Sequence, residues 1–321
     1  WEDIKLNHEE LVLPHHRLTD RPFALLPLLE VLPQAKVNKP IWAQEWIAPK
    51  PFNTVRSARY FWPQFVAVMN ITTDSFSDGG HLLNAENLLL HAEKQLKAGA
   101  TILDIGAEST RPKATFVSPE VEFKNLKWAF EQLRPLKKKY DFKFSLDCRH
   151  SDIVRQVLDL VKVDFLNDVT GFNSKEMQKL LKASKADAFV MHSLTIPPTA
   201  EDILPTAENP FEHLTAWWKK KKAQLIEAGI PKENLVFDPG IGFGKNAEQN
   251  IFILKNLDQL SDIEESILVG HSRKSYQKVF SDRSADQRDL ETALVTNDLN
   301  KAYTQFLRVH DVETQMTALR F

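Results

Sequence analysis

Short apolar runs alternate with amphipathic stretches from about residue 60 to the C-terminus. The apolar runs have the length of buried strands, and they lie at 65–69, 101–105, 143–146, 163–166, 186–191, 235–237, 266–269 and 304–309. Between them, apolar residues recur with helical spacing at 85–98, 121–139, 153–161, 174–183, 211–228, 247–260 and 286–302. Strands that alternate with helices pair in parallel through right-handed crossovers.

Eight such strands in about 260 residues predict an α/β fold of the (β/α)₈ TIM barrel type. A doubly wound open sheet is the alternative, although it usually has fewer strands or a second lobe. Residues 1–60 lack this rhythm and carry many of the 17 prolines, which interrupt helices and central strands. The pattern therefore predicts a short module at 1–33, a linker at 34–59 and the barrel at 60–321.

Composition and charge narrow the class of protein. The 321 residues are 43% hydrophobic and 26% charged with a net charge of −2, which argues against disorder and against a global attraction to nucleic acid or membrane. The run Trp217-Trp218 followed by Lys219–Lys222 fits a buried aromatic pair and a solvated basic helix face. No membrane span or signal peptide is predicted, and the single Cys148, a packing residue, fits a reducing cytoplasm.

Polar residues follow nearly every predicted strand. In a parallel barrel the carboxyl ends of the strands meet on one face, so these side chains should converge. Helix capping explains about half of them, but it does not explain cations beside the same mouth. The residues are Asn70, Asp104, Glu108, Asp147, Asn167, Asp168, His192, Asp238, Ser272, Lys274, Arg308 and His310.

Two loops near the first strands have more than one interpretation. The loop 70–80 carries Asn and Asp oxygens suited to Mg²⁺, and its Asp-Gly pair also suits a hinge, which composition alone slightly favours. The loop 104–112 contains Arg111, which could contact an anionic substrate or solvate a lid.

The segment 238–245 is rich in glycine without matching a Walker A loop or a dinucleotide fingerprint. It offers backbone clearance beside a planar ligand, while Asp238 can accept two hydrogen bonds from ring N–H groups. Asp147, Asn167 and Asp238 together would bind a 2-amino-4-oxo heterocycle.

Two further segments suggest an anion site. Ser272, Arg273, Lys274 and Ser275 place two hydroxyls and two cations at a helix start, although a Schiff-base role of Lys274 stays open. Arg308 and His310 are two residues apart on a strand end and point the same way, which suits phosphate or pyrophosphate. A core histidine bonded to its neighbouring aspartate is the alternative.

Taken together, these segments resemble the dihydropteroate synthase family over roughly residues 64–321. The resemblance rests on an ordered set: MNITTDSFSDGG, LDIGAESTRP, SLDC, LNDVTG, MH, DPGIGFGKNAEQN, SRKS and RVHD. Thr73, Ala107 and Cys148 depart from the family pattern, where Pro, Gly and Thr are usual.

The resemblance implies specific roles. The pterin ring would be held by Asp147, Asn167, Met191, Asp238, Phe243 and Lys274. Asn70, Arg308 and His310 would hold the pyrophosphate, with Asn70 also on its Mg²⁺. Phe76, Pro112 and Ser275 would lie near p-aminobenzoate, and Asp74 and Thr110 would act from the closing loops. Catalysis would rest on Asp147, Lys274, Arg308, His310, Asp74 and Thr110.

The resemblance also implies a reaction. p-Aminobenzoate would be joined to 6-hydroxymethyl-7,8-dihydropterin pyrophosphate, with release of pyrophosphate and dihydropteroate and without a covalent protein nucleophile. Mg²⁺ would assist pyrophosphate departure, and amine attack would follow. Family members are commonly homodimers. A methyltetrahydrofolate–corrinoid methyltransferase and a non-catalytic pterin-binding subunit are the alternative functions.

The N-terminal module has a resemblance of its own. The segment 13–30 is similar to the C-terminal part of the ferredoxin-like α+β pterin pyrophosphokinase that acts one step earlier. In that family the positions of His15 and Arg21 contact ATP, and that of Phe23 stacks on pterin. The acidic Mg²⁺ pair of the kinase is absent from the sequence given, so a fused kinase fragment is expected without kinase activity of its own.

Overall fold

The computed structural model describes residues 63–72, 84–109, 117–199 and 201–319, together with 6–8, 11–13, 18, 24–25 and 28. The chain divides into two compact units, Trp1–Trp62 and Pro63–Phe321. In the first, strands β1 (Leu6–His8) and β2 (Leu11–Leu13) pair antiparallel. The linker 34–59 and the kinase-like positions His15, Arg21 and Phe23 lie outside the described residues.

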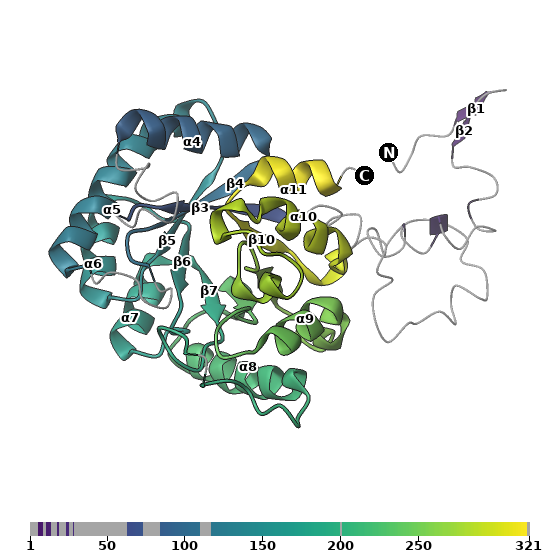
Figure 1. The fold of residues 1–321 in the computed structure, drawn as a ribbon. Helices are drawn as coiled ribbons and strands as arrows, with labels where there is room; N and C mark the ends of the chain where they lie inside the picture. Colours follow the sequence, from purple (N-terminus) through teal and green to yellow (C-terminus); the bar gives the residue numbers. More distant parts are fainter. Residues whose placement is uncertain are drawn as a thin grey trace. The chain divides into compact units, whose positions relative to one another are not determined.

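The second unit is a closed barrel of parallel strands in the order β10-β3-β4-β5-β6-β7-β8-β9, surrounded by helices (Figure 1). The predicted TIM barrel is therefore confirmed. The strands are β3 (Gln64–Asn70), β4 (Ala100–Gly106), β5 (Lys143–Asp147), β6 (Phe165–Asp168), β7 (Asp187–Met191), β8 (Leu235–Asp238), β9 (Ser266–Val269) and β10 (Phe306–Val309). The helices are α4 (Ala85–Ala98), α5 (Pro119–Leu133), α6 (Ser151–Leu160), α7 (Lys175–Ser184), α8 (Pro210–Glu227), α9 (Ala247–Lys255), α10 (Asp289–Asp298) and α11 (Val312–Leu319).

Helix ends follow local sequence signals. Asn84 caps α4 by accepting the backbone N–H of Glu86 at 2.8 Å, and Gly99 ends that helix in the left-handed conformation. The predicted helix 121–139 is wrong at its C-terminal end. There α5 gives way to a 3₁₀ turn, Arg134–Lys138, because Pro135 lacks an N–H and obstructs a continuing α-helix.

Other predicted helices are also too long, and one helix was missed. The stretch 247–260 splits at Asn256 into α9 and the 3₁₀ turn Leu257–Leu260. The stretch 286–302 is helical only over α10, flanked by short 3₁₀ turns. The sequence analysis predicted no helix after residue 309, where α11 follows the last strand and packs against α10 and α4.

Strand residues alternate between two apolar layers. One parity points into the barrel, where Phe165 and Phe189 stack with ring centroids 4.6 Å apart and Phe306 packs edge-on against both. The other parity packs against the helices, for example through Phe144, whose ring meets Phe130 of α5. Because side chains alternate with period two, residues at every second position share a face.

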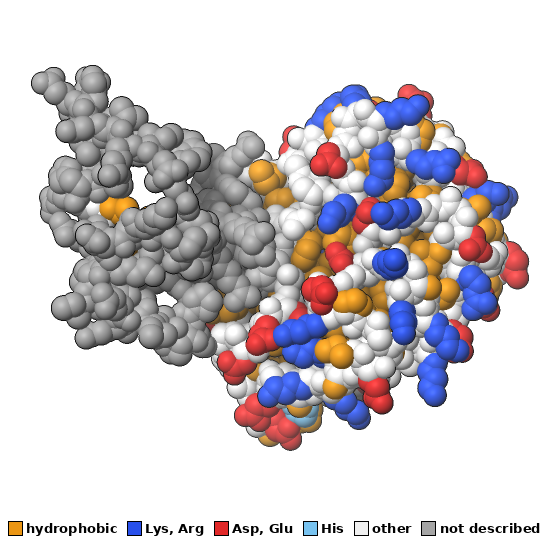
Figure 2. Space-filling model, turned by 180° about the vertical axis from the view of Figure 1, so that it is seen from behind, with side chains coloured by type: hydrophobic (Ala, Val, Ile, Leu, Met, Phe, Trp, Pro, Cys, Tyr) orange, Lys and Arg blue, Asp and Glu red, His pale blue; other side chains and the backbone are white. Residues whose placement is uncertain are grey.

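The outer surface carries both signs of charge. On the face of the barrel unit in Figure 2, Lys and Arg are interspersed with Asp and Glu. The predicted solvated basic face after Trp218 is wrong in part, because Lys221 is buried, donates to Asn173 and lies over Trp217, while Lys222 pairs with Glu265. In the part of the chain that the structure describes, no helix combines the length and apolarity needed to cross a membrane.

Candidate active site

Strand parity brings the polar strand-end residues to the inside of the barrel. Asp104 lies two residues beyond the inward Ile102, Asn167 two beyond Phe165, and Asp238 two beyond Val236. The opposite parity directs Asp168 toward its own loop, where it accepts the N–H groups of Thr170 and Phe172. Position along the strand therefore decides whether a strand-end aspartate faces the inside of the barrel, as Asp238 does, or its own loop, as Asp168 does.

One pocket of about 1130 Å³ opens at the carboxyl ends of the strands. Of the polar residues expected to converge at the strand ends, Asp104, Asp168 and His192 do not line it. The pocket is lined by all the described residues that the resemblance assigned to substrates or catalysis. These are Asn70, Asp147, Asn167, Met191, Asp238, Phe243, Lys274, Ser275, Arg308 and His310. Asp74, Phe76, Thr110 and Pro112 lie outside the described residues.

Arg308 of β10 connects two carboxylates from other strands. Its Nε donates to Asp104 Oδ2 and its Nη2 to Asp147 Oδ2, both at 2.6 Å. Asn167 Nδ2 donates to the same Asp104 oxygen at 3.1 Å. Because Asp104 is completely buried, its charge needs the guanidinium, and the guanidinium is in turn held in one orientation in the pocket.

Burial makes the pocket carboxylates harder to ionise. It raises the pKa of Asp147, against the opposing effect of the Arg308 guanidinium. It raises the pKa of Asp238 to about 6, although the backbone N–H of Gly240 and the nearby cations work in the other direction. Both groups therefore titrate close to neutral pH, as is common for residues at functional sites.

The glycine-rich loop 238–245 is fixed from within. Asp238 Oδ1 accepts the Gly240 N–H at 2.7 Å, and Lys245 Nζ bonds Gly240 O, Phe243 O and His192 Nδ1 at 3.0, 2.9 and 2.9 Å. At Gly240, φ is +67° and a Cβ would meet the His192 carbonyl oxygen at 1.8 Å. The clearance at Gly240 therefore serves the end of β7 rather than the planar ligand that the sequence analysis expected.

Cations and aromatic groups border the upper part of the pocket. Lys274 Nζ lies 4.2 Å from the Phe243 ring centroid, and its side chain packs against Gly242. His310 Nδ1 lies 2.9 Å from Ser272 Oγ, whereas Asp311 accepts from Thr314. His310 is thus a pocket residue, and the alternative of a core histidine bonded to Asp311 is wrong.

Three residues that line or support this pocket were not assigned to a substrate, although Asp104 and Glu108 belong to the polar set expected to converge at the strand ends. Asp104 interrupts an otherwise apolar strand, a signal that could have marked it as a buried ion-pair partner. Lys245, at the end of the glycine-rich segment, is buried, and burial lowers its pKa to about 7. Glu108 borders the pocket and accepts two 2.8 Å bonds from Arg149, which no local pattern indicates.

Comparison with known proteins agrees with this geometry. Residues 66–310 match the model of the pterin binding enzyme family. A folate synthesis bifunctional protein of Chlamydia caviae is 29% identical over 99% of this chain and 74% of its own length. The dihydropteroate synthase of Haemophilus influenzae is 33% identical over 80% of this chain and 92% of its own length.

A solved structure gives the same result. The dihydropteroate synthase of Anaplasma phagocytophilum, with bound 6-hydroxymethylpterin-monophosphate, superposes with a TM-score of 0.71 at 28% identity, covering 80% of this chain and 97% of that one. The match to the bifunctional protein extends over the N-terminal unit as well. The chain therefore belongs to the pterin binding enzyme family and, within it, to the dihydropteroate synthases.

Proposed function

We propose that this chain joins p-aminobenzoate to 6-hydroxymethyl-7,8-dihydropterin pyrophosphate in the pocket at the carboxyl ends of the barrel strands. The observation that carries the proposal is the meeting of Asp147, Asn167, Asp238 and Arg308 in one cavity. Pyrophosphate release that requires both substrates tests it. Release with the pterin substrate alone, at the same rate, would contradict the condensation.

The pterin ring would lie between the Asp147 and Asp238 carboxylates. With Oδ1 of Asp238 bonded to Gly240, its Oδ2 is the oxygen left for the ring N–H groups. Met191 and Phe243, which pack together with Val169, would contact the faces of the bicyclic ring. Lys274, beside Phe243, would donate to a ring acceptor. This arrangement gives apolar contact to the ring faces and polar partners to its edge.

The pyrophosphate would lie at the rim formed by Asn70, His310 and Arg308. The Asn70 side chain offers one hard oxygen at the end of β3, in a pocket that also contains cations for the phosphates. One protein oxygen, with water and phosphate oxygens as the other ligands, is a donor set that suits Mg²⁺. When bound, Mg²⁺ would neutralise charge on the leaving pyrophosphate.

The protein groups would divide the chemistry between the two ends of the breaking bond. Arg308 and His310 would stabilise the departing pyrophosphate, while the Asp147 carboxylate would stabilise positive charge on the methylene-pterin left behind. The arylamine of p-aminobenzoate, near Ser275, would then attack that carbon and lose its proton. The roles of Phe76, Pro112, Asp74 and Thr110 in p-aminobenzoate binding and closure remain part of the proposal.

Replacing the single protein ligand proposed for Mg²⁺ should change the metal requirement. We expect Asn70→Ala to raise the Mg²⁺ concentration for half-maximal activity about tenfold, because removing one ligand weakens a site that consists mainly of water and phosphate oxygens. The measurement is pyrophosphate release against Mg²⁺ concentration. An unchanged Mg²⁺ dependence would remove Asn70 from the metal site.

Activity should fall on the acid side of neutrality. Since burial raises the pKa of Asp238 to about 6, lowering the pH through this value adds a proton and removes an acceptor for the pterin ring. We expect kcat/KM for the pterin substrate to fall about tenfold per pH unit below that point. Because Asp147 and the substrate phosphates also titrate in this range, Asp238→Asn is the control. If kcat/KM of the Asp238→Asn variant falls with decreasing pH in the same way as that of the wild type, protonation of Asp238 is not the cause of the fall.

We also propose a homodimer that forms through exposed apolar residues near α10. Val279, Phe280, Leu290 and Leu294 are each more than half exposed, and Ser281 donates to Glu291 between the two segments. We expect Leu294→Glu to give a monomer in light scattering. The matched control is Leu90→Glu on α4, also an exposed leucine, which should stay dimeric. A monomeric wild-type chain would contradict the dimer.

The remaining parts of the proposal concern context. The N-terminal unit would belong to a pyrophosphokinase domain fused to the synthase, as the match to the bifunctional relative suggests. The unpaired Cys148 fits a reducing compartment such as the cytoplasm.

A further inference from the structure

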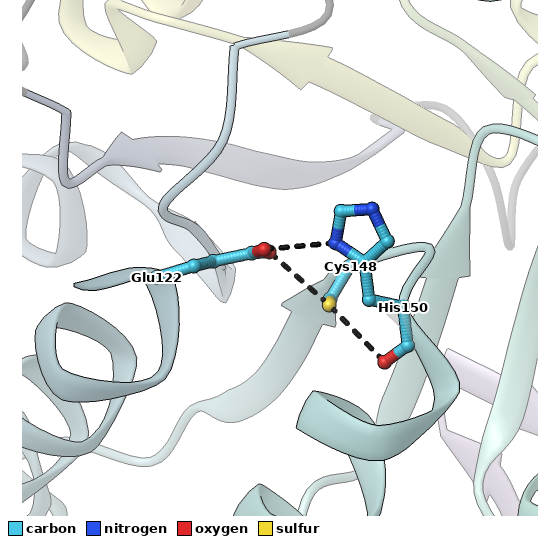
Figure 3. Close-up of side chains that lie close together, drawn as sticks. All are labelled: Glu122, Cys148 and His150. Atoms are coloured by element: carbon cyan, nitrogen blue, oxygen red, sulfur yellow. Dashed lines mark hydrogen bonds and ion pairs between the residues drawn. The ribbon is translucent and has the colours of Figure 1, made fainter. Parts of the chain in front are cut away.

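Glu122, Cys148 and His150 bring a carboxylate, a thiol and an imidazole together outside the pocket (Figure 3). Cys148 Sγ donates to Glu122 Oε1 at 3.3 Å, and His150 Nδ1 lies 2.9 Å from Glu122 Oε2. One atom from each residue lies within 4.8 Å of the other two. Small movements of these side chains would bring all three onto one ion.

The backbone holds the three residues from two directions. Glu122 is in the first turn of α5, whereas Cys148 follows β5 directly and His150 immediately precedes α6. The Cys148 backbone N–H also donates to Asn167 O at 3.1 Å, which fixes the start of this turn. His150 makes no side-chain capping bond to α6, and its ring faces Glu122 instead.

The charge of this cluster favours a cation. Glu122 is 0% exposed, and among the described residues its side-chain bonds are to the Cys148 thiol and the His150 imidazole. A buried carboxylate without a cation is costly, and the Cys148 thiol carries no positive charge to offset it. The adjacent Arg149 does not pair with it, because its guanidinium makes two bonds to Glu108.

We propose that Glu122, Cys148 and His150 bind one thiophilic divalent cation of the Zn²⁺ class, with water as the fourth ligand. Thiolate sulfur, imidazole nitrogen and carboxylate oxygen are the ligands Zn²⁺ takes in proteins, and three protein ligands with one open position are a common set. The His150 side chain is 34% exposed, which gives the ion a route from solvent. Magnesium, which prefers oxygen ligands, would not compete here.

The proton balance of binding is simple. Cys148 releases its thiol proton to solvent and binds as the thiolate. His150 binds through Nδ1, so the proton that Nδ1 donates to the Glu122 carboxylate moves through solvent to Nε2 of the same ring. Glu122 stays a carboxylate throughout. No oxidation or reduction occurs. The ion would tie α5 to the turn between β5 and α6, next to Asp147 in the pocket.

Cobalt titration tests this proposal, because Cys148 is the only cysteine of the chain. A thiolate-to-cobalt charge-transfer band therefore reports coordination at this residue alone. We expect one equivalent of Co²⁺ to produce the band and release one proton, and Zn²⁺ to displace it. Excess Mg²⁺ should leave it unchanged, and so should Asn70→Ala, which separates this site from the proposed catalytic metal.

Three variants decide whether the ligand set is correct. Cys148→Ser should abolish the band while its hydroxyl still donates to Glu122, so near-UV circular dichroism should stay unchanged. Glu122→Gln and His150→Gln should each weaken Co²⁺ binding at least about tenfold. Absence of the band in the folded wild-type chain would overturn the proposal. Wild-type affinity in either Glu122→Gln or His150→Gln would overturn it as well.

Discussion

Arg308→Met should abolish most of the activity and unfold at much lower denaturant concentration. The substitution leaves Asp104 buried at 0% exposure without the guanidinium that now lies 2.6 Å away. Removing one partner of a buried ion pair typically costs about 3–5 kcal/mol of unfolding free energy. Loss of the cation at the pyrophosphate rim should also lower kcat about 100-fold or more. Urea unfolding and steady-state pyrophosphate release measure the two effects.

A second substitution separates the two roles of Arg308. Asp104→Asn combined with Arg308→Met removes the buried Asp104 charge together with the guanidinium, so the double variant should recover part of the lost unfolding free energy. Activity should not recover, because the missing cation would act on the substrate rather than on Asp104. Recovery of both quantities together would mean that Arg308 serves only the fold. No recovery of stability would mean that the Asp104 bond is not the cause of the loss.

Asp238→Asn should impair use of the pterin substrate while leaving the fold intact. The amide oxygen can still accept the Gly240 N–H, now bonded to Oδ1 at 2.7 Å. The amide nitrogen then replaces Oδ2, the oxygen proposed to accept from the pterin ring. An amide N–H donor would face the ring N–H donors, and no hydrogen bond could form between them. Since hydrogen bonds to a charged group are worth about 1.5–3 kcal/mol each, kcat/KM for the pterin substrate should fall about 100-fold. KM for p-aminobenzoate should change little.

The matched control is Asp168→Asn, which changes another buried aspartate at the end of a barrel strand. Asp168 bonds Thr170 and Phe172 rather than facing the pocket. Asp168→Asn should therefore lower the free energy of unfolding by about 1–3 kcal/mol and leave the pterin kinetics close to wild type. If the two variants lose pterin binding equally, the assignment of Asp238 to the ring is wrong.

The sequence by itself determined the barrel and the face on which polar residues gather. Short apolar runs with the length of strands, and helical spacing between them, depend only on neighbouring residues, so they are visible in one dimension. Period-two alternation at the end of the last strand predicted that Arg308 and His310 point the same way, and both line the pocket. Helix ends were less accurate, as α5 shows, because a helical pattern can continue into a 3₁₀ turn.

Only the tertiary structure decided which of these groups touch. Arg308 meets Asp104 and Asp147 across 204 and 161 residues because the barrel closes β10 against β3. Burial, which no local pattern gives, raises the pKa of Asp238 to about 6. Packing of α5 beside the turn after β5 likewise brings Glu122 to the single cysteine. Contacts between distant segments and the loss of solvent around them arise only when the chain is folded.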